Sequence, residues 1–438
     1  MRRFIAVLLV LIMVSTLFYG TAYAAEPYTI KMLSIWSDSD ETGEAYVWCK
    51  IAQEYCEQHE GFDYEYEFCE QFDVSSKMAI LIASNDVPDL FSYEPGGAMD
   101  DLVKADAVVN MSQDLEKYTG YKLEDIYSDL SLQITRDAIS TEDLYNLPMK
   151  LQVEGIFYSK PLFEAQGYEV PTTWDEMMVL CDQMIADGIQ PFSMGGYDEW
   201  QITRWIMAYA CRQKDYDVHF DASKAQNGRT FSDDYMIEAY KMLQTFCEKG
   251  YFGKGYNSVD NPTMLSMFLN HQVAMMYNIY GDNFTEGGEG ELQEDEIGFF
   301  NIPVVTGTEM PEEAQKATFA VNCSLAICFG KEKAEAGTNN DFLRYWLENY
   351  GREQSKIGSI PCFTEEFLGQ PVTMSGLQEE VYTQVLDNCK YSTQWWEATM
   401  DTNTSNIALE NGQLLAEGSM TAEAYGEAQD LGVAERYE

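Results

Sequence analysis

The sequence predicts an α/β fold, because patterns typical of strands and of helices alternate along the first part of the chain. Residues 28–35 and 62–68 alternate apolar and polar side chains, a period of two that is typical of strands with one buried face. Between them, residues 44–59 repeat apolar side chains at helical spacing, and Gly61 ends this helix. Strands that alternate with helices favour a largely parallel sheet.

The same alternation continues beyond the second strand. A helix is expected through residues 78–82, and a turn at residues 86–89 leads into a short strand at Leu90 and Phe91. Residues 147–184 then predict a buried strand, a polar turn, a loop stopped by a proline, and a further helix.

The helix that ends this segment has both a start signal and a stop signal. Thr173 and Glu176 have the spacing of a capping box, in which the hydroxyl accepts a backbone N–H and the carboxylate reaches back to the helix start. Apolar side chains repeat at helical spacing over residues 174–185, so one face of the helix is apolar. Gly188 suits the left-handed residue that closes such a helix.

Acidic residues dominate the charge of the chain. It contains 73 Asp and Glu against 27 Lys and Arg, for a net charge of -46. Such a charge repels nucleic acid and anionic lipid surfaces, so neither is a good candidate partner. The charge either keeps an exported protein soluble or, in part, attracts a cationic ligand such as a polyamine, and composition alone leaves both explanations open.

The N-terminal residues predict export. Arg2 and Arg3 precede an apolar run at residues 4–14, and Ala22-Tyr23-Ala24 has the small residues of a cleavage site, so we expect a signal peptide that is cleaved near Ala24. The run is too short for a comfortable bilayer span, and no later stretch approaches about 20 uninterrupted apolar residues. The protein is therefore expected in the cell envelope or outside the cell.

Catalytic and metal-binding patterns are weak. The ten cysteines include no C-x-x-C pair and several lie in apolar patterns, so we expect mostly buried free thiols and leave one or two disulfides open. The three histidines lack zinc-type spacing, and we expect no metal and no cofactor. No G-x-S-x-G, H-E-x-x-H or phosphate-binding glycine loop is present. A glycosidase needs only two carboxylates, which 73 acidic residues can supply.

Several segments follow one another in a distinctive order: residues 147–184, 267–276, 297–303, 341–350, 358–361 and 414–424. This order resembles that of the extracellular solute-binding proteins of ABC importers, in the sugar-binding group similar to maltose-binding protein. The resemblance implies a periplasmic-binding-protein-like fold of type II, with two discontinuous lobes joined by a hinge with three crossovers. It places lobe one at residues 26–150 and 305–357, and lobe two at residues 151–304 and 358–438.

The implied ligand site lies between the lobes, where loops leave the carboxyl ends of the strands. A sugar site needs flat aromatic side chains for the C–H faces, with carboxylates and amides for the hydroxyls. Tyr93 and Glu154 match ligand-contacting positions of the family, and Tyr280, Trp395 and Trp396 lie where its sugar binders commonly place an aromatic side chain. The other candidates follow from their places in loops near predicted strands. The candidate ligand-binding residues are Trp36, Asp38, Tyr93, Glu94, Glu154, Tyr197, Trp200, Tyr280, Asp282, Trp395, Trp396 and Asp401.

The resemblance thus favours a non-enzymatic, exported receptor that captures a mono- or oligosaccharide and delivers this small-molecule solute to a membrane ABC permease. We expect a monomer that closes around its ligand. Many members carry a lipid-modified cysteine just after the signal peptide, but the first cysteine here is Cys49, so no lipobox cysteine is expected. Two alternatives stay open: a binder of a non-sugar solute such as a polyamine or peptide, and a secreted glycoside hydrolase.

Overall fold

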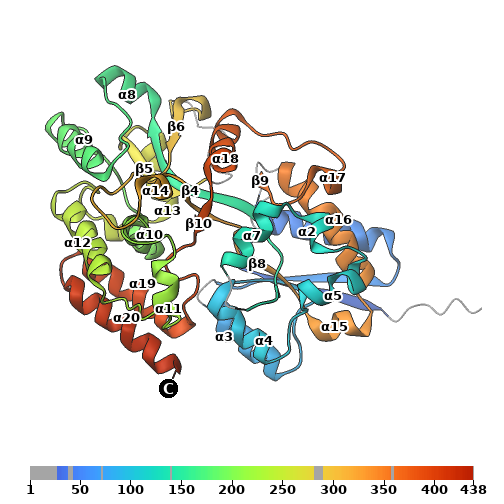
Figure 1. Ribbon diagram of the computed structural model, residues 1–438. Helices are drawn as coiled ribbons and strands as arrows, with labels where there is room; N and C mark the ends of the chain where they lie inside the picture. The colour runs from blue at the N-terminus through green and yellow to red at the C-terminus, as the bar shows by residue number, and fades with distance from the viewer. Residues whose placement is uncertain are drawn as a thin grey trace, which may run out of the picture.

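The computed structural model describes residues 27–37, 43–70, 73–138, 141–280, 290–356 and 360–437. The expected signal peptide at residues 1–24 and the candidates Asp38 and Asp282 lie outside these ranges. Within them, the chain forms two sheets with helices packed around both (Figure 1). This arrangement confirms the predicted α/β fold.

The first sheet has four strands in the order β2-β1-β3-β8. These strands are β1 (Tyr28–Ser34), β2 (Phe62–Phe68), β3 (Leu90–Tyr93) and β8 (Ala326–Phe329). β1 pairs in parallel with β2 and β3, as the alternation of strands and helices predicts, whereas β8 runs antiparallel to β3. Because β1 and β3 are parallel neighbours, the loops that follow them leave from the same edge of the sheet.

Helices cover this sheet on the right-hand side of Figure 1. They are α2 (Glu44–Gln58), α3 (Val74–Ala83), α4 (Met99–Lys104), α5 (Met111–Thr119), α6 (Leu123–Ile126), α7 (Asp129–Asp137), α15 (Lys331–Ala336), α16 (Asn340–Lys356) and α17 (Glu365–Leu368). The indole rings of Trp48 on α2 and Trp346 on α16 meet edge to face, with centroids 5.6 Å apart. Both side chains are fully buried, so this pair anchors α16 against a helix far away in sequence.

The second sheet has six strands, and four of them surround β4. The strands are β4 (Lys150–Ser159), β5 (Met275–Ile279), β6 (Ile297–Phe300), β7 (Thr318–Asn322), β9 (Ile360–Pro361) and β10 (Tyr391–Thr393). β4 pairs antiparallel with β5, β6, β7 and β9, and β10 pairs in parallel with β7. One long strand therefore organises this half of the molecule.

The remaining helices pack around the second sheet (Figure 1). They are α8 (Lys160–Gln166), α9 (Trp174–Ala186), α10 (Trp200–Ala210), α11 (Val218–Ser223), α12 (Asp234–Glu248), α13 (Asn261–Leu269), α14 (Glu312–Lys316), α18 (Gly376–Asn388), α19 (Thr402–Ala416) and α20 (Ala422–Tyr437). The predicted capping box of α9 is confirmed: Glu176 N–H donates to Thr173 Oγ1 at 3.2 Å, and Thr173 N–H donates to Glu176 Oε2 at 3.1 Å. Gly188 follows the helix in the left-handed conformation, with φ +77°.

The chain passes between the two sheets at places that differ in part from those expected. The predicted second crossover, residues 297–303, contains β6, which stays in the second sheet beside β4. The chain remains there through β7, and crosses between Asn322 and Ala326 to join β8 in the first sheet. The crossover therefore lies later than the expected boundary at residue 305. The reason is that β6 and β7 both pair with β4, at residues 156–159 and 152–154 of that strand, before the chain leaves the second sheet.

Burial is consistent with the expected chemistry of the thiols. Cys181, Cys211, Cys323, Cys328 and Cys362 are buried free thiols. A buried thiol behaves as a small apolar side chain. None of the helices in the described part of the chain combines the length and the apolar character that a membrane span requires.

Candidate ligand-binding site

A cavity of about 330 Å³ lies between the two sheets. One part of its wall comes from the loops that follow β1 and β3 and from the segment that joins β7 to β8. The other part comes from β4, β5, α10, α19 and the loop after β10. A concave site between two halves of a molecule is a common place for a small-molecule ligand.

Trp36 and Glu94 belong to the wall that the first sheet contributes. They follow the parallel neighbours β1 and β3, which explains why both side chains reach the same edge. The Trp36 ring packs against the buried Trp48, with ring centroids 6.2 Å apart, and its backbone N–H donates to Ser34 Oγ at 3.1 Å. These contacts hold the Trp36 indole at the cavity surface.

The second half of the molecule supplies two more indole rings and a pair of amides. Trp200 begins α10, and Trp395 lies just after β10. Gln152 on β4 and Asn322 on β7 are direct partners in the antiparallel register, so their side chains lie on the same face of the sheet. An amide offers both donors and acceptors to a polar ligand.

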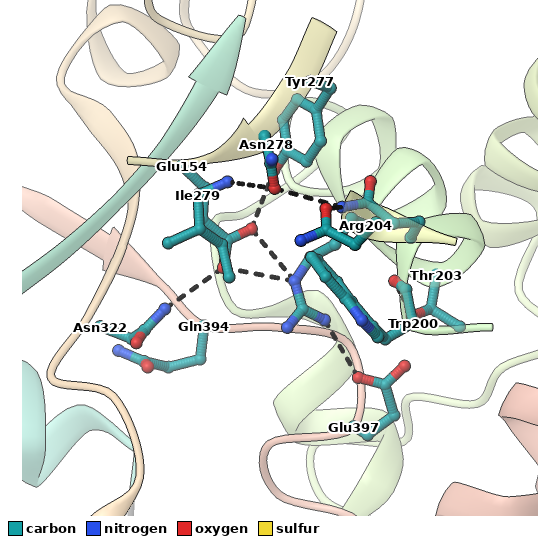
Figure 2. Close-up of polar contacts among 12 residues, drawn as sticks. Glu154, Trp200, Thr203, Arg204, Tyr277, Asn278, Ile279, Asn322, Gln394 and Glu397 are labelled. Carbon is teal, nitrogen blue, oxygen red and sulfur yellow. Dashed lines mark hydrogen bonds and ion pairs between the residues drawn. The ribbon is translucent and has the colours of Figure 1, made fainter. Parts of the chain in front are cut away.

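Arg204 connects the parts of this wall (Figure 2). Its Nε lies 3.1 Å from Glu154 Oε2, and its Nη1 lies 3.2 Å from Glu397 Oε2. The guanidinium carbon is 5.2 Å from the ring centroid of Trp200 and 5.9 Å from that of Trp395. One buried cation therefore holds two carboxylates and contacts both indole rings.

Glu154 is the buried carboxylate to which several residues of this cluster bond. Tyr277 Oη donates to Glu154 Oε2 at 3.1 Å, and Asn322 Nδ2 donates to Glu154 Oε1 at 3.2 Å. Burial raises the pKa of Tyr277 well above its ordinary value, and the negative charge of Glu154 adds to this effect. Burial alone lowers the pKa of Arg204, but the charges of Glu154 and Glu397 outweigh it, so its pKa is raised. Arg204 is thus held as a cation.

Asp198 adds a further carboxylate to the cavity wall. It accepts a hydrogen bond from the backbone N–H of Asn261 at 2.6 Å, at the start of α13. Burial raises the pKa of Asp198 above its ordinary value. Among the described residues, no group of three His, Cys, Asp or Glu side chains is arranged to hold a metal ion.

The sequence model of the bacterial extracellular solute-binding protein family matches residues 38–325, which is more than half of the chain. The chain belongs to the bacterial extracellular solute-binding protein family.

Two curated relatives are similar over part of their length. The "Alpha-glucosides-binding periplasmic protein AglE" of Rhizobium meliloti is 22% identical over 294 residues, which cover 63% of this chain and 60% of that protein. The "Multiple sugar-binding protein" of Streptococcus mutans is 23% identical over 211 residues, which cover 47% of this chain and 48% of that protein. This solute-binding protein therefore spans about half of the length of the curated relatives it matches.

Solved structures resemble nearly the whole chain. A "Chitin oligosaccharide binding protein" superposes with a TM-score of 0.80 at 18% identity, and the match covers 93% of this chain and 98% of that one. A structure titled "SBP RafE in complex with raffinose" superposes with a TM-score of 0.65 at 18% identity, over 92% of this chain and 98% of that one. These likenesses show the two-lobed, type II fold that the sequence predicts.

Four of the candidates named from the sequence line the cavity: Trp36, Glu94, Trp200 and Trp395. They come from four separate places in the chain, and the fold brings them to one site. Their contact with a ligand stays a prediction.

Other candidates lie beneath or beside the cavity. Trp396 is fully buried, and its Nε1 donates to Gln429 Oε1 at 2.7 Å. Tyr280 is buried in the hydrophobic core against Phe157, with ring centroids 6.3 Å apart. Glu154 is buried as described above, so it acts on the wall through Arg204.

Three more candidates have local roles. Tyr93 is buried in the core, and its Oη donates to Ser75 Oγ at 3.2 Å. Tyr197 is 66% exposed on a turn beside the cavity. Asp401 caps α19, where its Oδ1 accepts the Asn403 N–H at 3.0 Å.

Several residues of the cavity wall were not predicted from the sequence. Gln152 lies two positions before Glu154 on β4, and the strand period of two could have placed both on one face. Arg204 lies four positions after Trp200 on α10, a spacing that puts two side chains on the same side of a helix. Nothing in the local sequence indicates Glu397, whose partner Arg204 is 193 residues away.

Proposed function

We propose that this protein is an exported receptor that captures a carbohydrate in the cavity between its sheets and delivers it to an ABC permease. The observation that carries the proposal is the set of three indole rings, Trp36, Trp200 and Trp395, on one cavity of about 330 Å³. Sugars present apolar C–H faces that stack on such rings, and hydroxyls that bond to carboxylates and amides. The cavity wall carries both kinds of group.

The printed names of the relatives support the carbohydrate class. Those names refer to α-glucosides, multiple sugars, chitin oligosaccharide and raffinose. The family match supports an extracellular location and a role in binding. A cleaved signal peptide, a monomeric state and the absence of catalysis are parts of the same proposal.

Closure of the two halves around the ligand would remove the ligand and the cavity wall from water. We place lobe one at residues 27–149 and 323–369, and lobe two at residues 150–322 and 375–437. The limits at residues 150 and 322 follow the pairing of β4 with β7. β9 pairs with β4 but is placed with lobe one, because the Thr364 N–H donates to the Ile126 carbonyl at 2.8 Å and ties the adjacent start of α17 to that lobe. A ligand that binds the closed form better shifts the population toward it, and a permease can then recognise that form.

A thermal-shift screen tests the proposal. Mono- and oligosaccharides are compared with polyamines and short peptides, and a ligand present at 100 times its Kd should stabilise the fold by about 2.7 kcal/mol. We expect a rise in melting temperature with at least one sugar. Stabilisation by polyamines or peptides, with no response to any sugar, would overturn the carbohydrate class.

The hydrolase alternative has a separate test. The protein is incubated with the oligosaccharide that binds best, and new reducing ends are measured over time. We expect none above the rate of a heat-denatured sample. Turnover of the sugar would show that the protein is an enzyme.

A further inference from the structure

The charges around the cavity are unevenly balanced. Among the described residues that line it, Glu94, Asp198 and Glu397 are acidic and Arg204 is the single cation. Arg204 is already shared between Glu397 and the buried Glu154. The cluster of Glu154, Arg204 and Glu397 therefore contains one cation and two carboxylates, and Glu94 and Asp198 add further acidic groups to the cavity wall.

One carboxylate oxygen of Glu397 can accept a further hydrogen bond. Its Oε2 binds Arg204 Nη1 at 3.2 Å, but its Oε1 is buried and has no hydrogen-bond partner among the described residues. The Glu397 side chain is only 7% exposed, and the residue lines the cavity. Figure 2 shows this second oxygen with no dashed contact.

A buried acceptor without a partner is costly, and a ligand donor removes that cost. A hydroxyl or an ammonium group can donate to Glu397 Oε1. A carboxylate or a phosphate cannot donate there in its ionised form, and it would add negative charge beside Glu397 and Asp198. Arg204 adds little net attraction for such an anion, because its single positive charge is already shared between Glu154 and Glu397.

We propose that the cavity selects carbohydrates that carry no negative charge, and that Glu397 is the residue that determines this specificity by accepting a hydrogen bond from the ligand. This inference rests on the carbohydrate function proposed above. Neutral sugars and sugars with a protonated amine are the accepted classes. Uronic acids and phosphorylated sugars are the rejected classes.

Calorimetric titration of a matched set tests the selection. The set contains the neutral sugar with the largest thermal shift, its 2-amino-2-deoxy counterpart and its uronic acid counterpart; for a glucose unit these are glucosamine and glucuronic acid. We expect the amino sugar to bind at least as tightly as the neutral one. The uronic acid should bind more weakly by roughly tenfold or more, since like charges repel.

A uronic acid that binds as tightly as the neutral sugar overturns the inference but upholds the carbohydrate function. No binding by any member overturns the carbohydrate function itself.

Two variants locate the effect. Glu397→Gln keeps the size of the side chain but removes its charge, and we expect the difference between the neutral sugar and the uronic acid to shrink several-fold. Glu410→Gln removes the same charge from the exposed side of α19, outside the cavity, and should leave the difference unchanged. Equal effects of both variants would assign the selection to the overall charge rather than to Glu397. The ligand series on the unmodified protein does not depend on either variant folding.

Discussion

Trp395 and Trp396 are adjacent in the sequence but lie in opposite environments. Trp395 lines the cavity, with its ring centroid 5.9 Å from the Arg204 guanidinium carbon. Trp396 is fully buried and stacks on His219, with ring centroids 5.3 Å apart and an interplanar angle of 9°. One ring is available to a ligand, whereas the other is part of the core.

Replacement of each tryptophan by alanine should separate these roles. Trp395→Ala is expected to weaken sugar binding by roughly 0.5–1.5 kcal/mol, the contribution of an aromatic contact beyond its buried area. Trp396→Ala should instead lower the free energy of unfolding by about 3–5 kcal/mol, because it leaves a large cavity in the core. Calorimetric titration measures the first effect and urea denaturation the second. A Trp395→Ala protein with unchanged affinity would move the sugar away from this wall.

The sequence could identify aromatic candidates, but it could not assign each one to the surface or the core. Both Trp395 and Trp396 satisfy the same local pattern, and only packing decides between them. The cluster around Arg204 was harder to foresee, since Glu154, Arg204 and Glu397 come from β4, α10 and the loop after β10. Such a buried network is set by tertiary contacts rather than by any motif.

At the scale of single elements, local signals predicted α9 well. Its start depends on neighbours within four residues, so the spacing of Thr173 and Glu176 was sufficient. Thr173→Ala should lower the free energy of unfolding by about 1 kcal/mol, because a backbone N–H at the helix start loses its acceptor. Urea denaturation measures this loss, and Thr173→Ser, which keeps the hydroxyl, should retain most of the stability. Equal losses in both variants would contradict a capping role.

The short helix α11 carries a titratable group in a fully buried place. His219 Nε2 donates to the Gln394 carbonyl at 3.2 Å, and burial lowers the pKa of His219 to about 3, although that hydrogen bond opposes the shift. Between this pKa and the ordinary value near 6.5, the unfolded chain binds a proton that the folded chain does not. The folded state must therefore lose stability as the pH falls through this range.

His219→Gln should make this loss of stability shallower, by up to about 1.4 kcal/mol per pH unit. Burial also raises the pKa of Asp217 to about 6, which has the opposite sign, but Asp217 is present in both proteins and its effect cancels in the comparison. Urea denaturation at several values between pH 4 and pH 7 gives the two slopes. The matched control is His271→Asn, which removes an exposed histidine instead of a buried one. Parallel curves for the unmodified protein and His219→Gln would exclude a neutral, buried His219.

At the scale of the whole molecule, the order of motifs predicted two lobes but placed one crossover between them too early in the chain. The predicted boundary at residue 305 relied on a strand-like segment that β4 retains in the second sheet. Which strands pair with β4, and in which register, depends on all of its partners together. These partners are far apart in the sequence, so a short segment of sequence does not contain that information. The strand pairing therefore corrects a limit that local patterns could not supply.

An ion pair also joins the two halves outside the three crossovers. Arg436 Nη2, near the end of α20, lies 2.7 Å from Asp100 Oδ2 on α4, and both side chains are less than one-fifth exposed. α4 packs in the half that contains the first sheet and α20 in the half that contains the second (Figure 1). Because the pair can form only when these helices are close, it should favour the closed arrangement.

Asp100→Asn should weaken that preference by about 1 kcal/mol, the upper range for a partly exposed pair, and sugar affinity should fall up to about fivefold at low salt. Small-angle X-ray scattering without ligand should show a larger radius of gyration, and the difference should shrink as salt screens the pair. Asp101→Asn is the matched control on the same helix, since Asp101 pairs with Lys104 within α4 at 3.5 Å. If the two variants behave alike, the charge of α4 matters but the contact with α20 does not, and the closed form must be held by the hinge and the ligand alone.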